Sequence, residues 1–253
     1  MNRRDALKAL ALLATLGVHK DSLAIGASSK FGFAKLEYSG GDWNPRDGAL
    51  RTLLLEVEKR TSIAVEPTAT TTRADSEDLF LSPFLVWTGT TSFDPLSDPE
   101  VEALALYLRA GGFLLIDSAD ETVGGAFDRT VRAELSRILP SKALEPLSTD
   151  HVIYRSFFML DQPWGRTDAT TTLEGISQDD RLLVAYCQND LQGAWARDHF
   201  GTYLYDVVPG GKDQRELSFR FGINCVMYAL CVNYKADQVH IPFILKRRKW
   251  KVE

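Results

Sequence analysis

The sequence predicts a single α/β domain with a mostly parallel sheet and helices on both faces. Runs with the apolar period of strands alternate along the chain with runs that have the period of helices. Two strand-like runs, 84–87 and 113–116, are apolar without polar alternation, as in strands covered on both faces. The 253 residues are 45% hydrophobic and 25% charged, which is typical of a soluble globular protein.

Periodicity and end signals predict the elements of the first half. Asn44 and Pro45 suit the first positions of a helix, and apolar residues then recur on one helical face. Ser97 and Glu100 have the spacing of a capping box, and Gly111 ends the helix that they open. In chain order we expect strand 31–38, the helix from 44, strand 61–65, polar loop 68–76, helical turn 78–81, strand 84–87, helix 98–110, strand 113–117 and helix 129–139.

The second half is less regular. Its aromatic segment 195–208 favours no single element. No internal repeat or interdomain linker interrupts the chain, so we expect the α/β domain to cover residues 28–238. In chain order the predicted elements are strand 151–158, loop 162–166, strand 170–176, strand 181–187 and helix 221–234.

Residues 1–27 predict an export signal. Arg3 and Arg4 precede an apolar stretch, 9–18, that is much shorter than the roughly 20 residues needed to span a bilayer. The run from Arg3 to Lys8 resembles the bacterial twin-arginine export motif. We therefore expect a periplasmic protein. The alternative for this segment is that it forms an amphipathic surface helix.

The charge balance argues against a nucleic-acid partner. Lys and Arg number 29 against 34 Asp and Glu, which gives a formal net charge of −5. The one long basic run lies in residues 239–253, which are predicted to form a C-terminal tail. This tail is either solvated or in contact with anionic lipid headgroups. Membrane contact is expected only through the tail or the export signal.

Six short phrases, in order along nearly the whole mature chain, resemble the domain-of-unknown-function 4159 family. That family is similar in fold to the class I glutamine amidotransferases, which implies a flavodoxin-like sheet. Some of its members occur in bacterial envelope proteins. The resemblance implies a fold more than a function. The phrases are 33–38 with 42–43, 82–85, 111–117, 150–154, 189–191 with Trp195, and 222–224 with 228–230.

The glutaminase chemistry that such a fold commonly carries lacks its residues here. It needs a cysteine on a sharp turn after a strand, next to a histidine and an oxyanion hole. The matching turn follows Trp87 and contains no cysteine, and His151 is not followed two positions later by a glutamate. We expect no glutaminase activity and assign no catalytic residue, although a nucleophile within 90–92 stays an alternative. Small buried apolar roles are expected for Cys187, Cys225 and Cys231.

Ligands of open α/β sheets bind beyond the carboxyl ends of the strands. The loops 39–43, 88–92, 117–120 and 187–190 are predicted to lie there. Trp43 and Trp195, beside these loops, are candidates for a carbohydrate platform. The full set of candidate ligand-binding residues is Asp42, Trp43, Thr90, Asp117, Asp120, His151, Asn189, Asp190 and Trp195.

Two functions stay open from the sequence. One is an exported, non-catalytic domain that binds a protein partner or small ligand in the bacterial envelope, with no cofactor. The other is a hydrolase, metal-assisted or not, that uses Asp117, Asp120, His151 and Asp190. Convergence of these four groups around an open position would favour the hydrolase, whereas separate bonds to loop amides would favour binding.

We also expect Asp117 and Asp190 to lie at one edge of the sheet, because right-handed crossovers place the ends of parallel strands together. If both are exposed there, their replacement by alanine would impair binding and change stability by no more than about 1 kcal/mol. The alternative is that both carboxylates cap helices or bond loop amides.

Overall fold

The strands form one seven-stranded sheet in the order β2-β1-β3-β4-β7-β6-β5. This is a mostly parallel α/β sheet with the strand order of a flavodoxin-like fold, as predicted. The pairs from β2 to β7 are parallel, and β6 is antiparallel to both of its neighbours. The strands are β1 (Ala34–Glu37), β2 (Thr70–Arg73), β3 (Phe84–Gly89), β4 (Phe113–Ser118), β5 (Glu145–Pro146), β6 (Glu174–Gln178) and β7 (Arg181–Cys187).

The computed structural model describes residues 30–248, and the burial of side chains up to residue 231. The predicted export signal, 1–27, and the last five residues of the predicted tail lie outside the described residues. Residues 239–248 of that tail belong to the last helix. No helix in the described part of the chain combines the length and the apolar character needed to cross a membrane.

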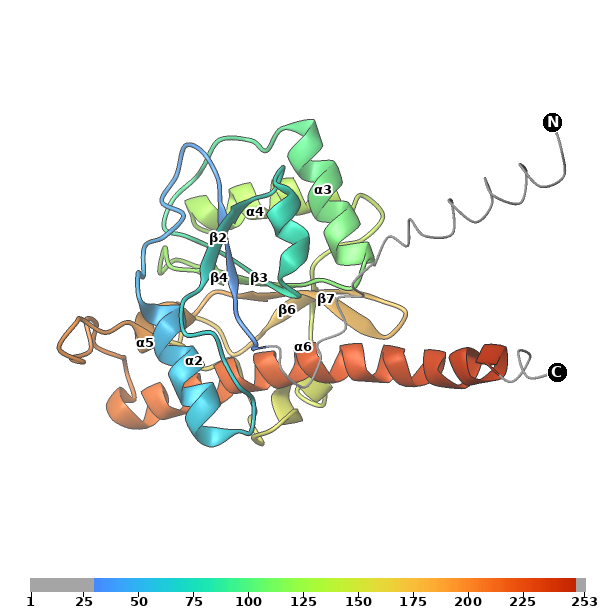
Figure 1. Cartoon of the computed structure of the whole chain (residues 1–253). Coiled ribbons are helices and arrows are strands. Elements are labelled where there is room, and N and C mark those ends of the chain that lie inside the picture. The colour runs from blue at the N-terminus through green and yellow to red at the C-terminus, as the bar shows by residue number, and fades with distance from the viewer. Residues whose placement is uncertain (1–29, 249–253) are drawn as a thin grey trace, which may run out of the picture. The chain divides into compact units, whose positions relative to one another are not determined.

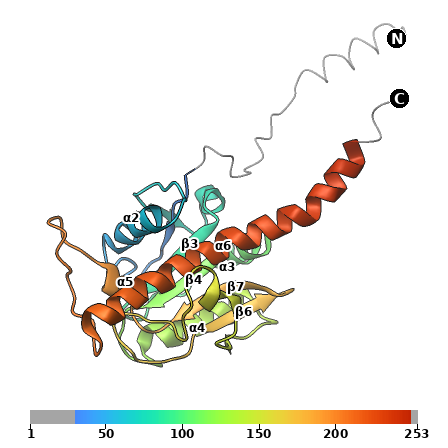
Figure 2. The same ribbon diagram turned by 90° about the horizontal axis from the view of Figure 1, so that it is seen from below.

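Two apolar layers cover the two faces of the sheet. Alternate strand residues point to opposite faces, so Phe84 and Val86 of β3 lie in one layer, and Leu85 and Trp87 in the other. Figures 1 and 2 show the helices divided between these faces, as predicted. The first layer holds α2 (Ala49–Arg60), α5 (Leu191–Trp195) and α6 (Gly211–Arg248), and the second holds α3 (Asp98–Arg109) and α4 (Ala126–Ile138).

Strong local signals predicted several elements well. The strand β7 has the predicted bounds, and the 3-10 helix η1 (Glu77–Leu81) contains the predicted helical turn. The capping box of α3 is present, since the Ser97 N–H donates to the Glu100 carboxylate at 2.8 Å. Gly111 follows this helix with a φ of 116°, a conformation that favours glycine.

Four predictions of secondary structure are wrong, three in the type of element and one in its first residue. Residues 61–65 are not a strand, because only Val65 forms an isolated bridge, and the predicted loop 68–76 contains β2 instead. The predicted strand 151–158 contains the 3-10 helix η2 (Val152–Arg155), whose Ile153 and Tyr154 are buried. The strand predicted at 170–176 begins only at Glu174.

Two helices have other boundaries than predicted. The first helix begins at Ala49 rather than Asn44, after Gly48 in a left-handed conformation. The Asn44 side chain instead accepts a hydrogen bond from Lys35 at 2.9 Å. The last helix extends beyond the predicted 221–234 in both directions. Cys187 and Cys225 are buried as predicted, whereas Cys231 is exposed.

Candidate functional site

The carboxyl ends of the parallel strands place the candidate site at one edge of the sheet. Asp117 is the last but one residue of β4 and is fully buried. Its carboxylate accepts the backbone N–H of Leu191 at 2.8 Å and that of Gln192 at 2.9 Å, both in the first turn of α5. Asp117 therefore ties β4 to the helix that follows β7, and the prediction that Asp117 and Asp190 share an edge is confirmed.

Burial and hydrogen bonding have opposite effects on the pKa of Asp117. Burial, together with the nearby Asp190, raises the pKa of Asp117 to about 7. The two backbone N–H groups from α5 oppose this shift because they favour the carboxylate. The Asp117 side chain has its acceptors directed at the backbone, so its observed role is to position α5.

Asp190 occupies the sharp turn between β7 and α5. It is fully buried, has a left-handed backbone conformation (φ 52°, ψ 63°) and accepts the Gly193 N–H at 3.0 Å. A Cβ atom at Gly193 would lie 2.2 Å from the Asp190 carboxylate, so this position requires glycine. The turn thus places a buried carboxylate at the start of α5, where the helix dipole favours negative charge.

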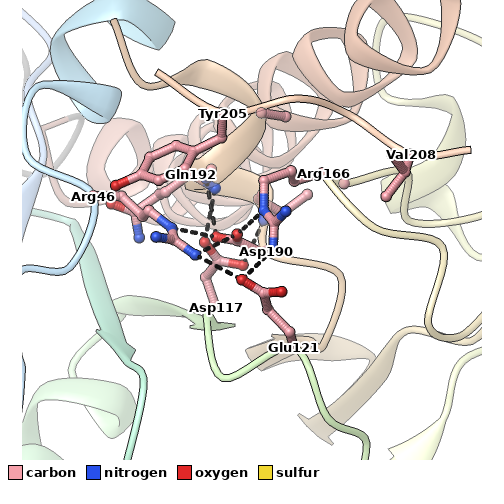
Figure 3. Close-up of polar contacts among 12 residues, drawn as sticks. Arg46, Asp117, Glu121, Arg166, Asp190, Gln192, Tyr205 and Val208 are labelled. Atoms are coloured by element: carbon pink, nitrogen blue, oxygen red, sulfur yellow. Dashed lines mark hydrogen bonds and ion pairs between the residues drawn. The ribbon is translucent and has the colours of Figure 1, made fainter. Parts of the chain in front are cut away.

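Two arginines from distant loops bind the Asp190 carboxylate (Figure 3). Arg46 makes a bidentate contact, with Nε 3.0 Å from Oδ1 and Nη2 2.8 Å from Oδ2. Arg166 approaches from the other side, with Nε 2.5 Å from Oδ2. Burial disfavours the charged form of Arg46, but the Asp190 carboxylate outweighs this and raises the pKa of Arg46. Both guanidinium groups are therefore charged and held in fixed orientations.

Glu121 closes the outer side of this arrangement. Its Oε1 lies 3.5 Å from Nη2 of Arg46 and also contacts Nη2 of Arg166. The Glu121 side chain is 52% exposed, whereas those of Arg46 and Arg166 are 9% and 11% exposed. We call Arg46, Glu121, Arg166 and Asp190 the edge cluster. Its two positive and two negative charges balance, and the aromatic ring of Tyr205 packs on Arg46 at 4.2 Å.

Asn189 organises the loop that carries Arg166. Its Nδ2 donates to the carbonyls of Pro163 and Thr170, each at 2.7 Å, and its Oδ1 accepts the Thr170 N–H at 3.0 Å. The backbone approach is so close that a Cβ at Gly165 would lie 2.1 Å from the Asn189 carbonyl oxygen. Asn189 is fully buried, so the structure gives it a positioning role rather than a ligand contact.

Asp120 has a comparable role at the next loop. Its carboxylate accepts the Thr122 N–H at 2.9 Å and the Phe127 N–H, in the first turn of α4, at 3.1 Å. It therefore shapes the loop that carries Glu121.

The candidates near β1 and β3 lie in separate loops at the same edge. Thr90 donates weakly to Asp42, with the two oxygens 3.4 Å apart, and this contact is exposed. Trp43 is half-buried, and the Lys35 ammonium lies 5.5 Å from the centre of its ring. None of these three side chains forms a hydrogen bond or ion pair with the edge cluster in the described structure.

The last two candidates do not belong to the edge cluster. Trp195 is fully buried in the first apolar layer, so the prediction that it stands at the surface as a carbohydrate platform is wrong. The His151 ring lies 5.7 Å from that of Tyr228, whose hydroxyl accepts the Leu182 N–H at the amino end of β7. His151 is thus at the opposite edge of the sheet from Asp117, and burial lowers its pKa.

The four residues of the hydrolase alternative do not converge. Asp117 and Asp120 bond backbone amides, Asp190 binds arginines, and His151 is at the far edge. Within residues 30–248, no three His, Cys, Asp or Glu side chains are grouped so that they could hold a metal ion. The assumption that Asp117 and Asp190 are exposed is also wrong, because both are fully buried. A stability change limited to about 1 kcal/mol is therefore no longer expected for their alanine variants.

Comparison with known proteins gives a family. The model of the family described as a domain of unknown function (DUF4159) matches residues 32–230. The chain belongs to this family. No curated protein matches the chain. The part that matches the DUF4159 family contains all seven strands and the complete edge cluster.

Sequence reasoning missed three of the four residues that form the edge cluster of this DUF4159 domain. Arg46, Glu121 and Arg166 lie in loops and belong to no periodic pattern. The available signal was their position: Glu121 directly follows the predicted polar loop 117–120, and Arg166 ends the predicted loop 162–166. Two arginines in loops near an acidic sheet edge could have indicated ion pairs there.

Proposed function

We propose that the protein is an exported, non-catalytic binding domain of the bacterial cell envelope. Its binding surface for a small ligand or protein partner is the carboxyl edge of the sheet. One observation carries this proposal: the carboxylates that could act as catalytic acids or bases are used in structural bonds, while a charged pair of arginines remains behind a half-exposed glutamate.

The positions of the cysteines support a non-catalytic function. Burial raises the pKa of the Cys187 and Cys225 thiols, which disfavours the thiolate that a nucleophile requires. The turn after β3, at 89–92, carries no cysteine. The flavodoxin-like strand order supports a relationship in fold to the class I glutamine amidotransferases, with their usual nucleophile lacking at this turn.

Site-specific photocrosslinking in cells tests the binding surface. We expect a crosslinker at Thr122, which is exposed beside Glu121, to form an adduct with a ligand or partner. The matched control is a crosslinker at Asp179, an exposed residue in the β6–β7 turn at the opposite edge. The measurement is the intact mass of the irradiated full chain. Adducts of equal yield at both positions, or none at Thr122, would contradict the proposal.

Export is tested separately, with the Arg3→Lys/Arg4→Lys variant. Lysine retains the charge, but a receptor-read address depends on residue identity, so most of the protein is expected to stay in the cytoplasm. Cell fractionation and immunoblotting measure the distribution, and Lys20→Arg is the control within the same segment. Undiminished periplasmic delivery of the double variant would rule out the twin-arginine route.

A further inference from the structure

The two arginines of the edge cluster have the geometry of a binding site for a carboxylate group. In this structure the carboxylate of Glu121 occupies that site. Asp190 binds Nε and Nη2 of Arg46 and Nε of Arg166. The outer side of both guanidinium groups is turned toward a single carboxylate, that of Glu121 (Figure 3). A planar guanidinium is well suited to bind carboxylate oxygens, and here two of them meet at one point.

The charges of the buried part require a second anion. Arg46 and Arg166 cannot lose their protons, and Asp190 is the one buried carboxylate that pairs with them in the described structure, because the oxygens of Asp117 are bound by the N–H groups of α5. A largely buried guanidinium without a counter-ion is unfavourable, so the site needs one more negative charge. Glu121 supplies it, but Glu121 is the one member of the cluster that is about half exposed. The buried residues Arg46, Arg166 and Asp190 therefore form the binding site. The exposed Glu121 is the residue that a ligand would displace.

The loop that carries Glu121 allows the release of its side chain. Glu121 has a φ of 61°, in the left-handed region that is sterically unfavourable for a glutamate. The following residues up to Gly124 are exposed, and Asp120 and Arg129 bond the backbone of Thr122 and Gly124, so release requires the Glu121 side chain to turn outward and leaves the loop and the core in place. A free ligand would then satisfy the arginines in place of the Glu121 carboxylate.

The charge balance selects a monoanion. With Glu121 displaced, the two arginines and Asp190 leave one positive charge, which one carboxylate neutralises. A phosphate dianion would add, close to the Asp190 carboxylate, a second negative charge that the two arginines do not balance. The site therefore fits a carboxylate better than a phosphate.

We propose that Arg46 and Arg166 bind the free carboxylate group of a ligand, and that Glu121 occupies this position until the ligand displaces it. This rests on the proposed binding function of the sheet edge and specifies its ligand class. The tethered Glu121 lowers the apparent affinity in proportion to the fraction of molecules in which the position is free. If the position is free in about a tenth of the molecules, removing the glutamate carboxylate lowers the apparent Kd about tenfold.

The test is a titration of the full chain and its Glu121→Gln variant with sodium acetate at constant ionic strength, followed by NMR shifts of the amides at 121–124 and 190–192. We expect saturation in the variant at an apparent Kd at least about tenfold below that of the wild type. Inorganic phosphate is titrated in parallel and is expected to bind more weakly.

A matched control exists elsewhere on the surface. Glu216 is 40% exposed and also bridges two arginines, but Arg60 and Arg220 are 23% and 41% exposed, and the carboxylate behind Arg60, that of Glu56, is not fully buried as Asp190 is. Glu216→Gln should leave acetate binding at the wild-type value. Glu121→Gly is the second variant, because glycine removes the carboxylate and suits the positive φ if Gln impairs folding.

Three outcomes would overturn the proposal: no saturable acetate shift in either folded Glu121 variant, tighter binding of phosphate than of acetate, or an equal gain in Glu216→Gln. Failure here with a persistent crosslink at Thr122 would leave the binding surface in place and remove only the carboxylate assignment. Failure of the crosslink would remove the binding surface itself.

Discussion

Replacing Asp190 with alanine is expected to lower the free energy of unfolding by about 3–5 kcal/mol, the range for removing one partner of a buried ion pair. The variant leaves Arg46 and Arg166 without their shared counter-ion while both stay largely buried. It also removes the acceptor of the Gly193 N–H at the start of α5. Chemical denaturation of the full chain measures the change.

The control for this prediction is Asp42→Ala at the same edge. Asp42 is exposed, and its side chain has a single weak contact with Thr90 at 3.4 Å, so its replacement should change stability by no more than about 0.5 kcal/mol. If Asp190→Ala has an effect as small as this control, the arginines do not depend on Asp190 for charge balance. The description of the edge cluster as a buried binding site would then be wrong.

Replacing Trp195 with alanine is expected to cost about 3–5 kcal/mol of stability, the range for truncating a fully buried large aromatic side chain. Trp195 lies in the first apolar layer beside Phe219, with ring centres 6.3 Å apart. Gly222 of α6 packs so closely that a Cβ there would lie 2.7 Å from the Trp195 ring. Truncation therefore opens a cavity between α5 and α6.

Thermal and denaturant unfolding of Trp195→Ala and Trp43→Ala distinguish the two tryptophans that the sequence placed near the site. Trp43 is only half-buried and its loss should cost clearly less. Trp195→Phe, which keeps a large apolar ring, should recover part of the lost stability. A Trp195→Ala variant as stable as the wild type would mean that this side chain does not support the packing of α5 on α6.

The parts of the fold that were predictable are those with strong local signals. The strands β3 and β4 are unbroken apolar runs, and α3 carries both its cap and its apolar face in sequence. The strand β2 was missed because it is at the edge of the sheet and consists of three threonines and an arginine, with little apolar alternation. Segment 151–158 was wrongly predicted to be a strand. Its buried apolar residues belong instead to a 3-10 helix.

The candidate site also contains residues that the sequence predicted and residues that it did not. Asp117, Asn189 and Asp190 were predictable because each follows or ends a buried parallel strand, and the topology sends those strand ends to one edge. The roles of these three residues were not predictable, because the position of a residue in a loop does not tell whether its side chain is exposed or buried. The contacts of Arg46 and Glu121 depend on packing between loops that are far apart in the chain, and no spacing in the sequence encodes them.

The Arg46–Asp190 ion pair also has a consequence for the order of folding. It joins residues 144 positions apart, and the loop-closure entropy for such a contact must be overcome before the contact contributes stability. The position of Asp190 also depends on the pairing of β7 with β4, which itself pairs with β3. We therefore expect the two guanidinium groups to come together late in folding, so that a partly folded chain lacks the complete edge cluster.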